Sequence, residues 1–313
     1  MNQPLTRRHA LFLFTVVVLA WGMNWAVTKT IVQSVAPLWG TAIRSAIATA
    51  ALLVLQLVRA QFIVPHRGDL PVIVAIALLH MVAFSALVAF GLRIAPVGRS
   101  IVLGYTTPLW VVPGAWLFLT EPMTRSRLAG TALGVLGLIA MFNPLAFDWN
   151  DHDALIGSGL ILLAAFCWAA NILYVRAHRW VSTPFQLAFW QTLLATMVLT
   201  GLATFFDGAP QIAWSPTLAG ALLYSGIFGT ALAYWAMAMV NRSLPAATTS
   251  LGILATPVIG VASSALVLGE PIDVSLIIAM AMILGGIAVG TIPAKRDAAN
   301  SRKQKLAASA VRP

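Results

Sequence analysis

The stretch that decides the fold runs from Val97 to Pro144 and reads VGRSIVLGYTTPLWVVPGAWLFLTEPMTRSRLAGTALGVLGLIAMFNP. A second copy of its landmarks lies 149 positions further along the chain, without a gap over 48 positions. Thr107-Pro108, Glu121-Pro122 and Pro144 return as Thr256-Pro257, Glu270-Pro271 and Pro293. Three proline positions rarely stay in register by chance, so the sequence predicts a duplicated unit.

The composition is that of a membrane protein. Hydrophobic residues make up 60% of the chain, charged residues only 9%, and the mean hydropathy is +0.89. Soluble domains average about 45–50% apolar and about 25% charged residues. The single cysteine, Cys167, lies in an apolar run, which excludes an intramolecular disulfide and a cysteine zinc cluster. We expect no cofactor, and we expect the lipid bilayer as a partner.

Ten apolar segments follow one another, each close to the ~20 residues that a helix needs to cross about 30 Å of hydrocarbon. They lie at 10–32, 38–58, 70–92, 97–120, 126–144, 155–177, 184–206, 215–240, 245–268 and 273–292. Their continuity argues against the alternating ~10-residue strands of a membrane barrel. No linker is long enough for a soluble domain. We therefore predict an all-α membrane protein with ten transmembrane helices.

The distribution of basic residues predicts the orientation. If the N-terminus is cytoplasmic, 15 of the 19 Lys and Arg residues fall on the inner face or in the tail, as the positive-inside rule requires. The net charge of +10 then reflects the inner loops rather than a nucleic-acid partner. Thr6-Arg7-Arg8 resembles the start of a signal peptide, but the following apolar run is too long for one. We expect a multi-pass protein of the bacterial inner membrane with both termini in the cytoplasm.

Five spans per unit is an odd number, so the second unit enters the membrane with the opposite polarity to the first. We place the first repeat at residues 1–147, the second at 148–294, and a basic, disordered cytoplasmic tail at 295–313. Near the start of the repeats the offset is 147, where Pro37 matches Pro184. Two inverted-topology repeats around one site in the middle of the membrane are typical of many secondary transporters.

Four motifs occur in order along the chain. They are Trp21-Gly22-Met23-Asn24, Pro37 with Arg44, Phe228-Gly229-Thr230-Ala231 with Tyr234, and Thr256-Pro257 through Leu268-Gly269-Glu270-Pro271. In this order they resemble the drug/metabolite transporter superfamily, in the branch of ten-span exporters called EamA-type. The first half departs from the pattern by having Thr120-Glu121-Pro122 in place of Gly-Glu-Pro. The resemblance implies an inner-membrane carrier that exports small metabolites, amino acids first among them, and it does not name the substrate because the family is broad.

Polar and aromatic residues in the middle of the spans form the candidate substrate site. Trp21 and Asn24 share one helix face, and the repeat places Trp168 and Asn171 at the matching positions of the second half. His80 lies about ten residues into its span, ~15 Å deep at ~1.5 Å per residue, where an ionisable group indicates function by default. The predicted substrate-binding residues are Trp21, Asn24, Arg44, His80, Tyr105, Trp168, Asn171, Gln191 and Tyr224.

Each of these residues has a structural alternative that the sequence leaves open. The asparagines either line a cavity or bond neighbouring helices, and His80 either serves transport or donates to a carbonyl. Arg44 lies about six residues inside the outer end of its helix, so its side chain snorkels to water, pairs structurally or binds a substrate carboxylate.

Prolines and glycines indicate helix geometry. Pro108 and Pro257 lie inside spans and are expected to kink the two symmetry-related helices. Small residues four positions apart, in Gly130–Gly134 and Gly286–Gly290, predict close contact between helices. We expect a monomer or a weak homodimer.

The sequence contains no His-Glu-x-x-His, G-x-S-x-G or Walker motif. We therefore expect a carrier of a small-molecule substrate rather than an enzyme, and one that ATP does not drive directly. The alternative is a channel-like or broader-specificity drug or metabolite efflux protein, although no charged ring or filter-like loop is visible. Since no carboxylate lies near a midplane, we hypothesise facilitated export, or proton coupling through His80, whose unperturbed pKa of about 6.5 suits that task.

Overall fold

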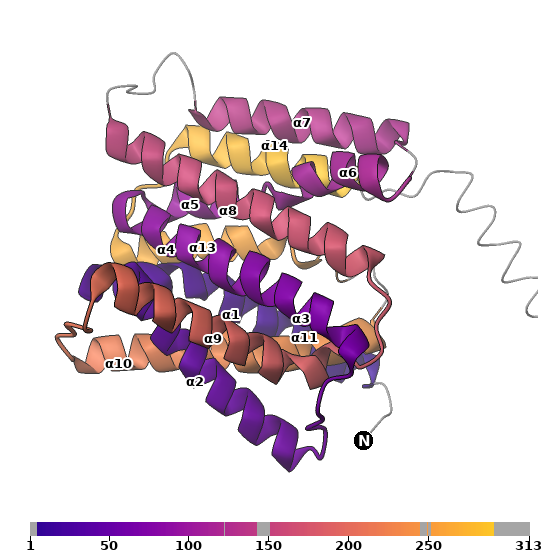
Figure 1. The fold of residues 1–313 in the computed structure, drawn as a ribbon. Coiled ribbons are helices and arrows are strands. Elements are labelled where there is room, and N and C mark those ends of the chain that lie inside the picture. The colour runs from indigo at the N-terminus through magenta and orange to yellow at the C-terminus, as the bar shows by residue number, and fades with distance from the viewer. Residues whose placement is uncertain (1–4, 122, 143–150, 245–248, 250–251, 291–313) are drawn as a thin grey trace, which may run out of the picture.

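The computed structural model describes residues 5–121, 123–142, 151–244, 249 and 252–290 of the 313-residue chain. Helices run alongside one another in one bundle (Figure 1), and the described residues contain no β-strand. The prediction of an all-α protein is confirmed for this part of the chain.

The first half of the chain contributes α1 to α7. Their bounds are α1 Arg7–Ser34, α2 Pro37–Val58, the 3₁₀ turn η1 Arg67–Asp69, α3 Leu70–Ala75, the π-helix η2 Ile76–Phe84, α4 Ser85–Ile94, α5 Val97–Gly104, α6 Thr107–Phe118 and α7 Arg125–Phe142. The elements from η1 to α4 follow one another without a break and form one long helix.

The second half contributes the remaining helices. Their bounds are α8 His152–Ala177, α9 Pro184–Asp207, α10 Pro216–Leu223, the π-helix η3 Tyr224–Leu232, α11 Ala233–Ser243, α13 Ala255–Leu268 and α14 Val274–Gly290. Here too a π-helix joins two α-helices, so α10, η3 and α11 form one continuous rod.

Local chemistry explains where several helices begin and end. A proline stands in the first turn of α2, α9 and α10, where its missing N–H removes no helical hydrogen bond. Thr183 and Gln186 form a capping box at the start of α9, in which the Thr183 N–H donates to Gln186 Oε1 at 3.0 Å. The helix α13 ends at Gly269, whose φ of 68° lies in the left-handed region that suits glycine.

Within the residues that the structure describes, seven helices are long and apolar enough to cross a membrane. They are Arg7–Ser34, Pro37–Val58, Arg67–Ile94, Val97–Phe118, His152–Ala177, Pro184–Asp207 and Pro216–Asn241. The helices α13 and α14 are apolar but shorter, at 14 and 17 residues. The chain is therefore a multi-pass membrane protein. The count of ten spans and the inverted arrangement stay predictions, and parts of the predicted spans 126–144, 245–268 and 273–292 lie outside the described residues.

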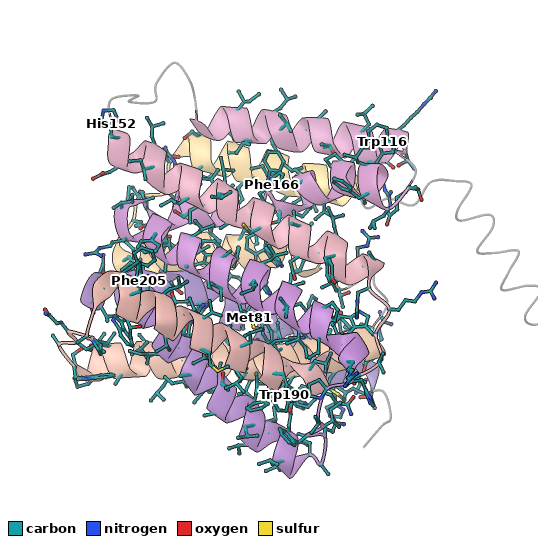
Figure 2. All side chains as sticks on the ribbon, in the orientation of Figure 1. Met81, Trp116, His152, Phe166, Trp190 and Phe205 are labelled. Atoms are coloured by element: carbon teal, nitrogen blue, oxygen red, sulfur yellow. The ribbon has the colours of Figure 1, made fainter. Side chains whose placement is uncertain are left out.

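The outer surface of the bundle is rich in large apolar side chains. Phe205 is 80% exposed, and Trp116 and Phe166 are each 55% exposed (Figure 2). Soluble monomers rarely expose contiguous apolar patches of more than a few hundred Å². An apolar exterior is the surface expected of a protein whose surrounding solvent is lipid.

The two halves of the chain meet through matching residues of α2 and α9. Ser45 Oγ donates to the Thr192 carbonyl at 3.4 Å, and the hydroxyl oxygens of Thr49 and Thr196 are 3.1 Å apart. The members of each pair are 147 positions apart, which is the offset of the repeat. Contacts between equivalent residues are typical of an interface around a two-fold axis, so they favour a two-fold relation between the halves.

The helices α7 and α14 lie side by side at one edge of the bundle (Figure 1). A Cβ atom added to Gly286 would lie 2.5 Å from the Gly130 carbonyl oxygen and 2.7 Å from the Gly134 nitrogen. The two backbones therefore touch where these glycines lie. The close helix contact that the glycine spacing predicted exists, and it lies within one chain.

Pro108 and Pro257 both stand in the first turn of a helical segment rather than at a bend in a continuous helix. The helix α6 begins at Thr107 and α13 begins at Ala255. Before Pro108 the helix is interrupted between Gly104 and Thr107, because a proline cannot donate the hydrogen bond that would continue the preceding turn. The structure thus shows a break just before the proline where the sequence predicted a kink at it.

Acidic side chains bind backbone N–H groups at the ends of the bundle. Asp69 is fully buried and accepts from the Ser182 hydroxyl at 2.7 Å and from its N–H at 3.2 Å. Glu270, which follows α13, accepts from the Val97 N–H at 2.8 Å and the Gly98 N–H at 2.9 Å. These two N–H groups belong to the first turn of α5 and have no partner within that helix. Glu270 therefore connects the end of α13 to the start of α5.

Candidate functional site

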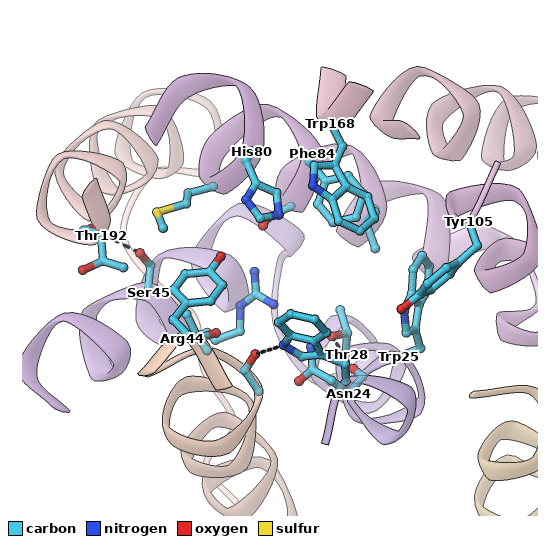
Figure 3. A pocket seen from close by; sticks show the side chains of 17 residues that line it. Asn24, Trp25, Thr28, Arg44, Ser45, His80, Phe84, Tyr105, Trp168 and Thr192 are labelled. Atoms are coloured by element: carbon cyan, nitrogen blue, oxygen red, sulfur yellow. Dashed lines mark hydrogen bonds between the residues drawn. The ribbon is translucent and has the colours of Figure 1, made fainter. Parts of the chain in front are cut away.

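A cavity of about 170 Å³ lies between the helices (Figure 3). Its lining comes from α1, α2, η2, α4, α8, α9, η3 and α11, and from the break between α5 and α6. Both halves of the chain therefore build it. Because no single segment encloses the space, its shape depends on how the helices pack.

Six of the nine predicted substrate-binding residues line this cavity. They are Trp21, Asn24, Arg44, His80, Tyr105 and Trp168. Trp21, His80 and Trp168 lie near the middle of the long helices Arg7–Ser34, Arg67–Ile94 and His152–Ala177. The cavity is thus about halfway along the spans, and the role of these residues in binding stays a prediction.

The other three predicted residues do not line the cavity. Asn171 and Gln191 are 6% and 4% exposed, and Asn171 Oδ1 and Gln191 Nε2 have no hydrogen-bond partner. Tyr224 donates its hydroxyl to the Ala20 carbonyl at 3.2 Å, and its ring stacks on Phe228 with 5.8 Å between ring centroids. The asparagines of the two repeats therefore differ in position, since Asn24 borders the cavity and Asn171 does not.

Aromatic rings form one wall of the cavity. The rings of His80 and Trp168 are nearly parallel, with 5.5 Å between centroids and 3° between planes. The ring centroids of Phe84 and Trp168 are 5.2 Å apart. The ring of Tyr105 meets that of Trp168 edge to face, with 6.4 Å between centroids and 86° between planes. Edge-to-face and offset contacts of this kind stabilise aromatic clusters, so the wall is held in place by its own members.

Two π-helices present residues to the cavity. The helix η2 carries His80 and Phe84, and η3 carries Gly229 and Thr230. They start at Ile76 and Tyr224, which are 148 positions apart, and each covers 9 residues. π-helical turns occur frequently at functional sites because the wider turn displaces side chains from the α-helical register. Their equivalent positions in the two halves favour a shared role in shaping the site.

The helices α1 and η3 are in close contact where they line the cavity. Trp21 Nε1 donates to the Gly229 carbonyl at 3.2 Å. A Cβ atom added to Gly229 would lie 2.5 Å from Asn24 Oδ1, so the amide oxygen fills the place that a side chain would need. Asn24 Oδ1 is buried and has no hydrogen-bond partner.

The cavity contains a cationic side chain and no carboxylate. Arg44 borders it with the hydroxyl groups of Ser45 and Tyr234, and no lining residue is Asp or Glu. Glu121 and Glu270 lie in the linkers that follow α6 and α13, outside the lining. Among the described residues, no group of three or more His, Cys, Asp and Glu side chains is placed to hold a metal ion.

Several lining residues were not among those predicted. Those that carry rings or hydroxyl groups include Trp25, Ser45, Phe84, Thr192 and Tyr234. Helical spacing from predicted residues was the available signal for two of them, because Trp25 follows Trp21 by four positions and Phe84 follows His80 by four. For Tyr234 and Thr192 the signal was weaker, since only tertiary packing brings them to the cavity.

A multi-pass helix bundle with an aromatic and polar cavity halfway along its helices is the architecture of a membrane transport protein. The model of the EamA-like transporter family matches residues 8–143 of this chain and matches again at residues 155–291. The chain therefore belongs to the EamA-like transporter family, within the drug/metabolite transporter superfamily.

Individual proteins show the same likeness over most of their length. The uncharacterized transporter YoaV of Bacillus subtilis is 23% identical over 281 residues, 90% of this chain and 96% of the relative. A probable amino-acid metabolite efflux pump of Salmonella typhimurium is 27% identical over 291 residues, 88% of this chain and 92% of the relative. A solved crystal structure superposes with a TM-score of 0.64 at 20% identity, covering 93% of this chain and 99% of that one, which shows a shared fold.

Proposed function

We propose that this protein is a carrier that exports small metabolites, amino acids or their close relatives, across the bacterial inner membrane. The observation that carries the proposal is the cavity itself, which both halves of the chain build and which lies midway along the long helices. Its aromatic and polar lining suits one small molecule at a time. The name of the Salmonella relative, an amino-acid metabolite efflux pump, supports the substrate class.

The proposed mechanism is alternating access by two five-helix repeats of inverted topology, residues 1–147 and 148–294. The family match in two copies and the contacts between equivalent residues of α2 and α9 support a duplicated architecture. Two related halves around one midplane site can rock against each other, so that the site faces one side of the membrane at a time. The glycine contact of α7 with α14 is satisfied within the chain, which favours a monomer.

The test is exchange across liposomes that contain the purified protein. Vesicles loaded with an unlabelled amino acid or amino-acid metabolite are expected to accumulate the labelled compound transiently and with saturation. Trp168→Ala removes one ring of the aromatic wall of the cavity. It is expected to lower the exchange rate about tenfold or more, as the loss of a central aromatic contact does in binding sites. Membrane expression is expected to stay near the wild-type level.

The matched control is Trp116→Ala, because Trp116 is 55% exposed on the outer surface and absent from the cavity. Equal loss of exchange in both variants would contradict the proposed site. Flux that rises linearly with concentration and shows no exchange would indicate a channel instead.

Orientation gives a second prediction. A cytoplasmic reporter fused after Arg312 is expected to be active, because the basic residues load the inner loops. The same reporter fused after Asp207, at the end of the seventh predicted span, is expected to be inactive, and a periplasmic reporter is expected to give the opposite pattern. Periplasmic activity after Arg312 would contradict the ten-span topology, since it requires an odd number of spans.

A further inference from the structure

Arg44 is a half-buried cation that lines the cavity and pairs with no described carboxylate. No hydrogen bond or ion pair joins its guanidinium to any residue that the structure describes. Figure 3 shows the side chain of Arg44 directed into the same space that His80 and Trp168 border. Removing a charge from water is costly unless another charge or a set of hydrogen bonds compensates it. An anionic ligand in the cavity would compensate this charge.

The rings that line the cavity determine which anion fits. Trp21, Trp168, Tyr105 and Tyr234 border the cavity along with His80 and Phe84. Aromatic side chains favour flat ligands because offset-stacked and edge-to-face contacts bury large areas with little loss of conformational entropy. A cavity of about 150 Å³ lined by apolar groups takes one benzene molecule, so 170 Å³ has room for one ring and a short substituent.

The cavity offers no carboxylate to pair with an ammonium group. None of its lining residues is Asp or Glu. The acceptor that lacks a partner, Asn24 Oδ1, is buried against Gly229, where a Cβ atom would already come within 2.5 Å of it. A ligand ammonium would therefore meet the field of Arg44 without a compensating carboxylate, and like charges in a low-dielectric site repel each other.

We propose that the cavity binds small aromatic monocarboxylates, organic anions with one flat ring and no amino group, and that Arg44 binds the carboxylate. This inference rests on the proposed carrier function and narrows its substrate class from amino acids to their deaminated aromatic relatives. The planar guanidinium presents N–H donors in a fork that matches both oxygens of a carboxylate. Arg44 is thus the residue that sets specificity by charge, and the aromatic wall sets it by shape.

Three compounds with the same ring test the charge rule, namely phenylacetate, phenylalanine and phenethylamine, which are an anion, a zwitterion and a cation at pH 7.5. Binding to the purified full-length protein is measured by ligand-induced shifts in melting temperature and by quenching of tryptophan fluorescence. We expect phenylacetate to bind about tenfold or more tightly than phenylalanine, and phenethylamine to be the weakest, as expected for a site with one cation and no carboxylate. Cyclohexylacetate, which has the same charge and a non-planar ring, is expected to bind more weakly than phenylacetate.

Equal or tighter binding of phenylalanine or phenethylamine would overturn the charge rule, and equal binding of cyclohexylacetate would overturn the shape rule. Arg44→Gln is expected to remove the preference for phenylacetate, and Arg44→Lys, which keeps the charge but loses the fork, to reduce it. If Arg44→Gln does not fold, the wild-type series decides alone. Exchange of amino acids without binding of phenylacetate would leave the carrier function standing and refute this inference. Binding of phenylacetate without exchange of any compound would support the binding preference and refute the carrier function.

Discussion

Replacing Gly286 by alanine is expected to destabilise the protein strongly, whereas the same change at the neighbouring Gly285 is expected to be neutral or stabilising. A Cβ atom at Gly286 would lie 2.5 Å from the Gly130 carbonyl oxygen and 2.7 Å from the Gly134 nitrogen. These are backbone atoms of a packed helix, so they cannot rotate away and α7 must separate from α14. Overpacking of this kind costs typically about 1–3 kcal/mol and occasionally more.

Gly285 is the matched control, because it lies in the same helix and receives the same methyl group. A Cβ atom there would meet only Leu133 Cδ2, at 3.9 Å, which is ordinary van der Waals contact. Alanine is favoured over glycine in a helix interior by about 1 kcal/mol, so Gly285→Ala is expected to keep or raise the melting temperature in detergent. Gly286→Ala should therefore lower the melting temperature, and Gly285→Ala should not. Similar shifts at both positions would show that the glycine contact does not limit stability.

The long spans were predictable from the sequence because lipid imposes a simple rule. A segment that crosses hydrocarbon must satisfy its backbone hydrogen bonds internally, so a long apolar run has almost no alternative to a helix. The same rule made Trp21, Arg44 and His80 predictable as candidate site residues, since polar or ring-bearing residues in the middle of a span face protein or water rather than lipid. All three border the cavity.

Details that depend on packing between spans were not predictable. The π-helices η2 and η3 leave no recognisable pattern in an apolar run, yet they carry His80 and Gly229 to the cavity. The repeat alone implied equal places for Asn24 and Asn171, and packing placed only Asn24 at the cavity. Internal symmetry predicts which positions correspond, and tertiary contacts decide what each position does.

Glu121 and Glu270 show the same divergence at the ends of the bundle. They match in the repeat at an offset of 149 positions. Glu121 forms ion pairs with Arg127 at 3.0 Å and Arg176 at 2.6 Å, in which the arginine side chains are 30% and 46% exposed. Glu270 instead binds the two N–H groups of Val97 and Gly98. Glu121 therefore takes part in two partly solvated ion pairs, and Glu270 caps a helix.

Because of this difference, Glu270→Gln is expected to lower stability much more than Glu121→Gln. Glutamine keeps the size of the side chain but offers one acceptor oxygen, so at least one of the two N–H groups at the start of α5 loses its partner. Hydrogen bonds to charged groups contribute about 1.5–3 kcal/mol, and the negative charge also interacts favourably with the helix N-terminus. We expect a loss on the order of 2 kcal/mol for Glu270→Gln, combining these two effects.

Exposed ion pairs contribute about 0–1 kcal/mol to stability. Glu121→Gln is therefore expected to change the free energy of unfolding by less than about 1 kcal/mol. Melting temperatures of the two purified variants, measured in the same detergent, compare the two acids directly, and added salt separates their causes. Salt screens exposed charges far more than buried or hydrogen-bonded ones, and in 0.5 M NaCl the Debye length is roughly 4 Å. Salt at this concentration should therefore remove the stability change caused by Glu121→Gln and leave most of the change caused by Glu270→Gln. Equal losses for the two variants, or a loss for Glu270→Gln that salt abolishes, would mean that Glu270 acts as a surface charge and not as the cap of α5.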